Sequence, residues 1–158
     1  MKLTKFQTML GFGFLIVILI AVFDITAMNS LIFGTPSDYV TGNYTSGWWT
    51  LFSYIAMTLI ILLGALYYFV INKDISETIA VMLVPLLLWR MFGLADILFF
   101  WLQGIPVPST LPWLSGQPFI FFANLVGSKV VTNVSLYIQT AIGIAVTLYS
   151  AKILKNRF

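Results

Sequence analysis

The stretch that decides the fold is Trp48–Ile71, which reads WWTLFSYIAMTLIILLGALYYFVI and contains no charged residue. An apolar run of this length crosses a bilayer as a helix, because about 20 residues rising 1.5 Å each span the roughly 30 Å of hydrocarbon. Open strands are excluded there, since lipid cannot satisfy their backbone groups. The stretch therefore predicts a transmembrane helix.

Composition extends this prediction to the whole chain. Of its 158 residues, 60% are hydrophobic and only 8% are charged, and the mean hydropathy is +1.00. An ordinary soluble domain carries roughly a quarter charged residues. The composition therefore excludes a water-soluble globular domain, a disordered chain and a free nucleic-acid binder. The length suits a single membrane domain that covers residues 1–158.

Three further segments are long and apolar enough to cross, at about 8–28, 76–102 and 130–153. Pro85 predicts a kink near the middle of the third span. The apolar stretch 111–127 is interrupted by two prolines, Pro112 and Pro118, and by several polar or small residues. Its uninterrupted apolar runs are too short to cross, so it predicts an interfacial or re-entrant segment. We therefore expect an all-α polytopic integral membrane protein, a four-transmembrane-helix bundle with this additional outer segment.

The basic residues predict the orientation. An N-in model with four spans places six of them inside and only Lys129 in an outer connection; the six are Lys2, Lys5, Lys73, Lys152, Lys155 and Arg157. The positive-inside rule thus puts both termini in the cytoplasm. We expect the membrane that holds the chain to be the cell membrane. The tryptophans Trp48, Trp49, Trp101 and Trp113 fall near the predicted outer interface. Cleavage of the first span after Ala27, as a secretory signal, stays open.

The chain contains neither cysteine nor histidine. This excludes thiol chemistry, the Ser-His-Asp triad and histidine-ligated metals, and we expect neither a metal site nor a cofactor. Asp74 and Glu77 have the D-x-x-E spacing of a capping box and are expected to cap the third span. These two carboxylates therefore have a structural explanation.

Asp24, Arg90 and Asp96 lie inside predicted spans, where ionisable residues are costly and point to function. Counting from the inner boundaries puts both aspartates in the outer part of the membrane. Arg90 comes six residues before Asp96, so a continuous helix would place it about 9 Å deeper. On such a helix the two side chains would lie about 120° apart. This geometry favours a partner for Arg90 on another helix, or an anionic ligand.

The fourth span adds a polar stripe that we expect to face the bundle, made of Thr132, Ser135, Gln139, Gly143 and Ser150. Gln139, and Thr58 in the second span, fall near the level of Arg90. The sequence therefore predicts a ligand site open to the outside and formed by Arg90, Asp96, Gln139, Trp89 and Thr58.

Three functions fit this pattern. The first is a small membrane-complex subunit or a protein that binds a lipid or other amphiphile. Its expected partners are membrane lipids, other membrane subunits or a second copy, and no nucleic acid.

The second is a membrane-embedded enzyme. The stretch Ala95–Phe100 resembles the E/D-x-x-F-F element of membrane carotenoid cyclases at Asp96, Phe99 and Phe100, which would imply lipid or isoprenoid chemistry with Asp96, and Asp24, as catalytic groups. The third is an oligomeric small transporter or channel.

Overall fold

The computed structural model describes residues 4–29, 46–114, 119–125 and 127–157. Within these ranges every regular element is a helix. Only an isolated bridge between Thr110 and Thr132 departs from this. The helices long and apolar enough to cross a membrane are Lys5–Ala27, Tyr54–Asn72 and Asn133–Ile153, and a bent pair counts as a fourth span if taken as one. This confirms the all-helical class, and the expected four candidate spans are reached only when the bent pair is counted as one.

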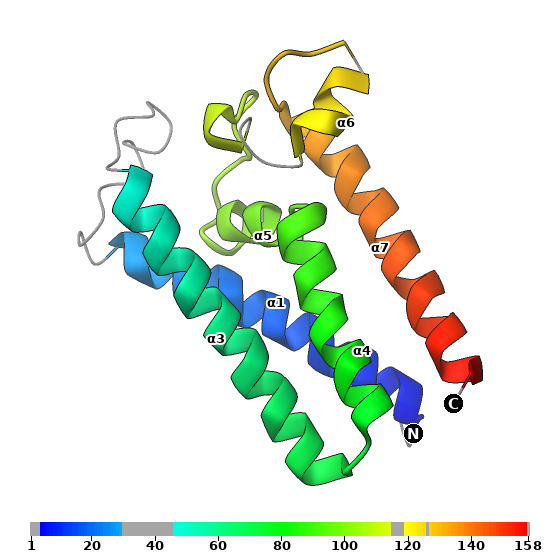
Figure 1. Cartoon of the computed structure of the whole chain (residues 1–158). Coiled ribbons are helices and arrows are strands. Elements are labelled where there is room, and N and C mark those ends of the chain that lie inside the picture. Colours follow the sequence, from blue (N-terminus) through cyan, green and yellow to red (C-terminus); the bar gives the residue numbers. More distant parts are fainter. Residues whose placement is uncertain (1–3, 30–45, 115–118, 126, 158) are drawn as a thin grey trace.

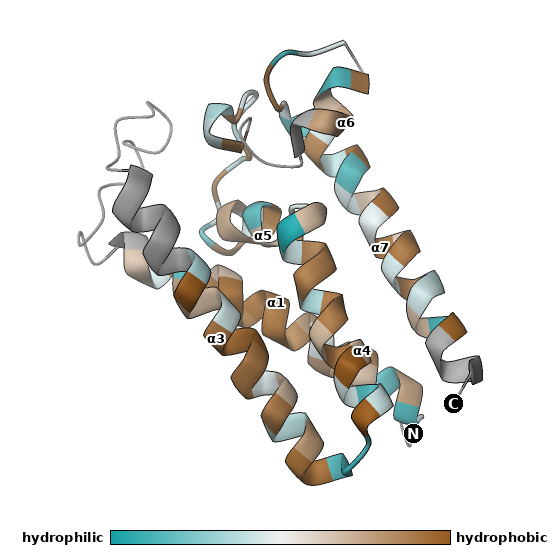
Figure 2. Ribbon diagram, viewed as in Figure 1, coloured by the Kyte–Doolittle hydropathy of each residue, from teal (hydrophilic) through white to brown (hydrophobic). Residues whose placement is uncertain are grey.

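Four long helices form the bundle (Figure 1): α1 (Lys5–Asn29), α3 (Ser46–Asn72), α4 (Ile75–Pro85) and α7 (Asn133–Arg157). The middle helix is α4, which packs against α1 and α3 and more lightly against α7. Brown apolar residues predominate on the coloured parts of α1, α3 and α4, paler and teal residues alternate with brown ones on α7, and the turn between α3 and α4 is teal (Figure 2). Their outward-facing leucines and isoleucines suit a lipid environment.

The turn between α3 and α4 is fixed by side chains. Asp74 caps α4, since its carboxylate accepts the backbone N–H of Glu77 at 3.0 Å. Glu77 does not complete the expected capping box. Its carboxylate instead accepts a hydrogen bond of 2.9 Å from the Tyr68 hydroxyl on α3. The capping prediction is therefore right for Asp74 and wrong for Glu77, which ties the two helices together.

The third span is broken, not merely kinked at Pro85. The helix continues past Pro85 as the π-helical segment η1 (Leu86–Met91), and the chain then bends by 78° before α5 (Leu94–Leu102). At the bend, Gly93 has φ +69°, a left-handed conformation that glycine adopts without steric cost. The sequence predicted a kink at Pro85 within 76–102, whereas the main change of direction falls at Phe92–Gly93.

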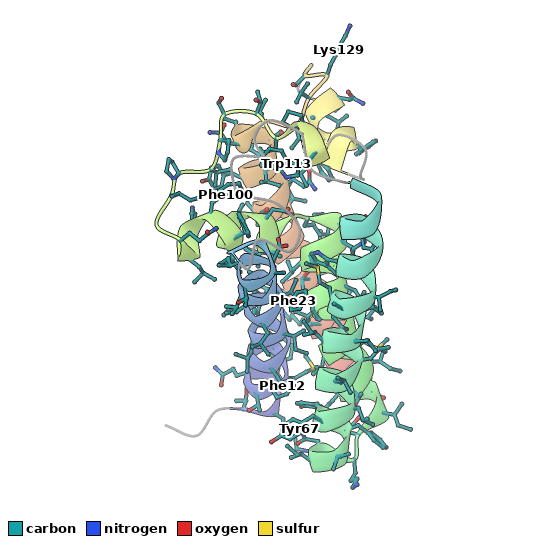
Figure 3. The ribbon with its side chains drawn as sticks, turned by 90° about the vertical axis from the view of Figure 1, so that its left-hand side faces the viewer. Phe12, Phe23, Tyr67, Phe100, Trp113 and Lys129 are labelled. Carbon is teal, nitrogen blue, oxygen red and sulfur yellow. The ribbon has the colours of Figure 1, made fainter. Side chains whose placement is uncertain are left out.

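An apolar core caps the end of the bundle opposite the turn between α3 and α4 (Figure 1). It joins α5, the loop 103–111 that follows it, η2 (Pro112–Leu114) and the residues just before α7. Its buried residues include Ile97, Phe100 and Leu111. The Leu111 N–H donates to the Val131 carbonyl at 2.8 Å, which ties the loop to the start of α7. Trp113 packs on Phe100 at a ring separation of 6.5 Å, so this tryptophan contributes to a core (Figure 3).

Helix α6 (Phe119–Leu125) has seven residues, too few to cross a membrane. It lies beside the start of α7 (Figure 1). The described part of 111–127 therefore contains no span, in agreement with the sequence. An interfacial or re-entrant position for this segment stays a prediction.

Candidate functional site

The break in the third span places two opposite charges at two helix ends. Arg90 lies in the last turn of η1, and Asp96 lies in the first turn of α5. A cation at a helix C-terminus and an anion at an N-terminus both stabilise the helix dipole. The positions of Arg90 and Asp96 thus have a local explanation. Each charge offsets the partial charge of a helix end that the break creates inside the bundle.

The 78° bend also changes where Asp96 lies. Along a helix turned by this angle, each residue advances only about 0.3 Å in the direction of α4, compared with 1.5 Å on a straight helix. The expected 9 Å step from Arg90 to Asp96 is therefore wrong. Helix α5 instead runs across the bundle and packs against α1. The predicted angle of 120° between Arg90 and Asp96 does not apply either, since they sit on different helices.

This crossing brings Asp96 close to Asp24 of α1. The two carboxyl groups are near enough to interact electrostatically, and Arg90 interacts with Asp96 in the same way. One carboxyl oxygen of Asp24, Oδ1, is fully buried and has no hydrogen-bond partner. A buried carboxyl oxygen without a donor is costly. The structure therefore unites all three ionisable residues that the sequence singled out, and leaves one acceptor unsatisfied.

Arg90 is held by aromatic rings. Its guanidinium carbon lies 4.2 Å from the centre of the Tyr54 ring on α3 and 5.3 Å from that of Trp89. The rings of Tyr54 and Trp89 are 6.2 Å apart. Such cation–π contacts hold a guanidinium where water is scarce. Asp24, Arg90 and Asp96, together with Tyr54 and Trp89, are called the break site below.

Gln139 and Thr140 on α7 donate hydrogen bonds to the end of the broken helix. The Gln139 amide donates to the Met91 carbonyl at 2.8 Å, and the Thr140 hydroxyl donates to the Phe92 carbonyl at 2.6 Å. These carbonyls belong to the last turn before the break, where the regular helical ladder ends. Gln139 therefore satisfies a backbone carbonyl at the end of the broken helix. Its hydrogen bond stabilises the break and does not indicate ligand binding. Its other amide atom, Oε1, is buried and has no partner in the described structure.

The predicted stripe on α7 does face the bundle. Ser135, Gln139 and Gly143 are buried, and Thr132 and Ser150 are partly buried. At Gly143 the Phe92 side chain comes so close that a β-carbon would lie 2.2 Å from its Cγ atom. The stripe is thus a packing surface for the break.

Thr58 does not join the break site. It lies on the exposed face of α3, while Tyr54, one turn earlier, contacts Arg90. Counting placed Thr58 at the level of Arg90, but its side chain is exposed and the larger Tyr54, one turn away, makes the contact. Sequence analysis missed Tyr54 and Thr140. Thr140 could have been found from its position next to Gln139 in the polar stripe. Nothing in the sequence of α3 indicated that Tyr54 contacts a charged residue.

The described residues include no group of three potential metal ligands. No family model, curated protein or solved structure matches this chain. Any assignment of function therefore depends on the chemistry of the break site itself.

Proposed function

We propose that this chain is a multi-pass membrane protein that binds the polar head of a lipid or another amphiphile at the break site. The observation that carries this proposal is the buried Asp24 Oδ1, which has no hydrogen-bond donor although a second carboxyl, that of Asp96, lies near enough to interact with it. Ionisable groups inside a membrane bundle are rarely present without a functional reason. A ligand that supplies the missing donor accounts for the arrangement.

In this proposal Arg90 binds an anionic or carbonyl group of the head, and Asp96 orients it. Trp89 and Tyr54 form the apolar wall beside the guanidinium. Arg90 is 15 residues beyond Ile75, the first residue of α4, and so about 22 Å along the segment. This depth lies within reach of the outer leaflet, where an amphiphile keeps its head.

The test is the lipid that copurifies in mild detergent. We expect native mass spectrometry to detect one bound amphiphile per folded protein. Arg90→Gln and Asp96→Asn should each lose it, while Thr58→Ala, on the exposed face of α3, should retain it. If both charge variants keep the bound species while their melting temperatures match the parent, the break site is not the binding site.

A second candidate function is a membrane-embedded enzyme that modifies a lipid or isoprenoid. What favours it is that Asp24 and Asp96 lie together, because a pair of nearby carboxyls suits general acid catalysis. Asp96 would then donate the proton. Turnover of a lipid by the reconstituted protein, lost in Asp96→Asn, would favour the enzyme over the binding protein.

We further infer that both termini and the turn between α3 and α4 lie in the cytoplasm. Lys73 sits in that turn, and Lys129 lies at the opposite end of the bundle from Tyr67 (Figure 3). The distribution of basic residues supports this orientation. Because the chain has no cysteine, a single introduced thiol reports on one position. In intact cells Ser109→Cys, at an exposed position of the loop before α7, should react with an impermeant maleimide and Lys73→Cys should not; the reverse pattern would invert the topology.

A further inference from the structure

The charges at the break site do not balance. Among the described residues, Asp96 interacts both with a second carboxyl, Asp24, and with one guanidinium, Arg90, which already rests on the faces of two aromatic rings. The atom that lacks a partner is an acceptor, Asp24 Oδ1. A ligand that completes this site must therefore bring hydrogen-bond donors, and a positive charge improves the fit.

A metal ion fits these residues poorly. Hard cations take six to eight oxygen ligands, or keep several waters when they are as small as Mg²⁺. The described part of the chain places no third acidic residue with Asp24 and Asp96. A primary ammonium group needs less, because it offers three N–H donors that two carboxyls and one further acceptor can satisfy.

Resting on the proposed function, we propose that the ligand is a zwitterionic amphiphile of the aminophospholipid type. Its primary ammonium group binds between Asp24 and Asp96, and its phosphate binds Arg90. The bend at Gly93 is what makes this possible, because it turns α5 across the bundle and sets an acidic helix start against α1. The two signs of charge at the break site thus match the two charges of one headgroup.

Three phospholipids with identical acyl chains test this proposal. Phosphatidylethanolamine carries a primary ammonium, phosphatidylcholine carries the same charges without N–H donors, and phosphatidylglycerol has no amine. We expect the purified chain to bind phosphatidylethanolamine about tenfold more tightly than the other two, the effect of roughly one charge-assisted hydrogen bond. Native mass spectrometry in mild detergent measures the three occupancies at equal lipid concentration.

Asp24→Asn should remove the preference, so that the occupancy of phosphatidylethanolamine falls to that of phosphatidylcholine in the same variant. Asp38→Asn removes the same charge outside the described residues and serves as the matched control. Equal binding of all three lipids by the parent chain would overturn the ammonium site while leaving the proposed function in place. Absence of any stoichiometric lipid would instead overturn the proposed function. The comparison on the parent chain decides the question even if Asp24→Asn fails to fold.

Discussion

Gly143→Ala is expected to lower the free energy of unfolding by about 1–3 kcal/mol, the usual cost of overpacking a well-filled core. The added β-carbon would lie 2.2–2.7 Å from three atoms of the Phe92 side chain, closer than atoms can approach. Phe92 has little room to retreat, because its ring already packs on that of Phe122 at 6.3 Å. Thermal or steric-trap unfolding in mild detergent measures the loss.

Gly11→Ala is the control for this substitution. Gly11 also lies within a long apolar helix, but no atom lies within 4 Å of the position of its β-carbon. We expect this variant to unfold like the parent or slightly later, since alanine favours a helix more than glycine does. Phe92→Ala should relieve the clash, so that Gly143→Ala costs less in that background. If Gly143→Ala costs the same with and without Phe92, the contact does not cause the loss.

The second large effect is expected from the combined variant Gln139→Leu and Thr140→Val. It leaves the Met91 and Phe92 carbonyls without their donors, and each unsatisfied buried acceptor costs about 1–3 kcal/mol. Both residues are at least 95% buried, so water cannot readily replace them. Equilibrium unfolding of the two single variants and of the double variant measures the sum and any coupling between them.

Thr147→Val is the matched control on the same helix. Thr147 is as deeply buried as Thr140, but its hydroxyl has no hydrogen-bond partner in the described structure. Removing an unpaired buried hydroxyl should leave stability unchanged or raise it. A loss at Thr147 as large as that at Thr140 would mean that the change of shape, and not the hydrogen bond to Phe92, sets the cost.

Much of the fold could be predicted, because apolar length alone identifies a spanning helix. The bundle-facing stripe of α7 was also predictable, since its polar residues recur at a helical period around Gln139 and Gly143. On α3 the same reasoning failed. Tyr54 and Thr58 lie one turn apart on nearly the same face, so their spacing did not indicate that Tyr54, and not the exposed Thr58, meets Arg90.

The break could not be predicted, because its causes are distant in sequence. Pro85 was the visible irregularity, yet the chain turns at Gly93, which takes a left-handed conformation two residues after the end of the π-helix. The carbonyls that this exposes are satisfied by residues 48 positions later. Asp24, Arg90 and Asp96 could be selected by their charge in an apolar span, but only the bend brings Asp96 to α1.

The broken span also has a mechanical consequence for the surrounding bilayer. Helix α4 and η1, with 11 and 6 residues, rise about 25 Å before the chain turns aside, which is less than the roughly 30 Å of hydrocarbon in a typical membrane. The exposed side chains Ile75, Ile79 and Leu83 present this short stretch to lipid. Hydrophobic mismatch of this kind thins the adjacent leaflets or favours thinner membranes. Within a bilayer, the bend that builds the break site would thus also couple the protein to the thickness of the membrane.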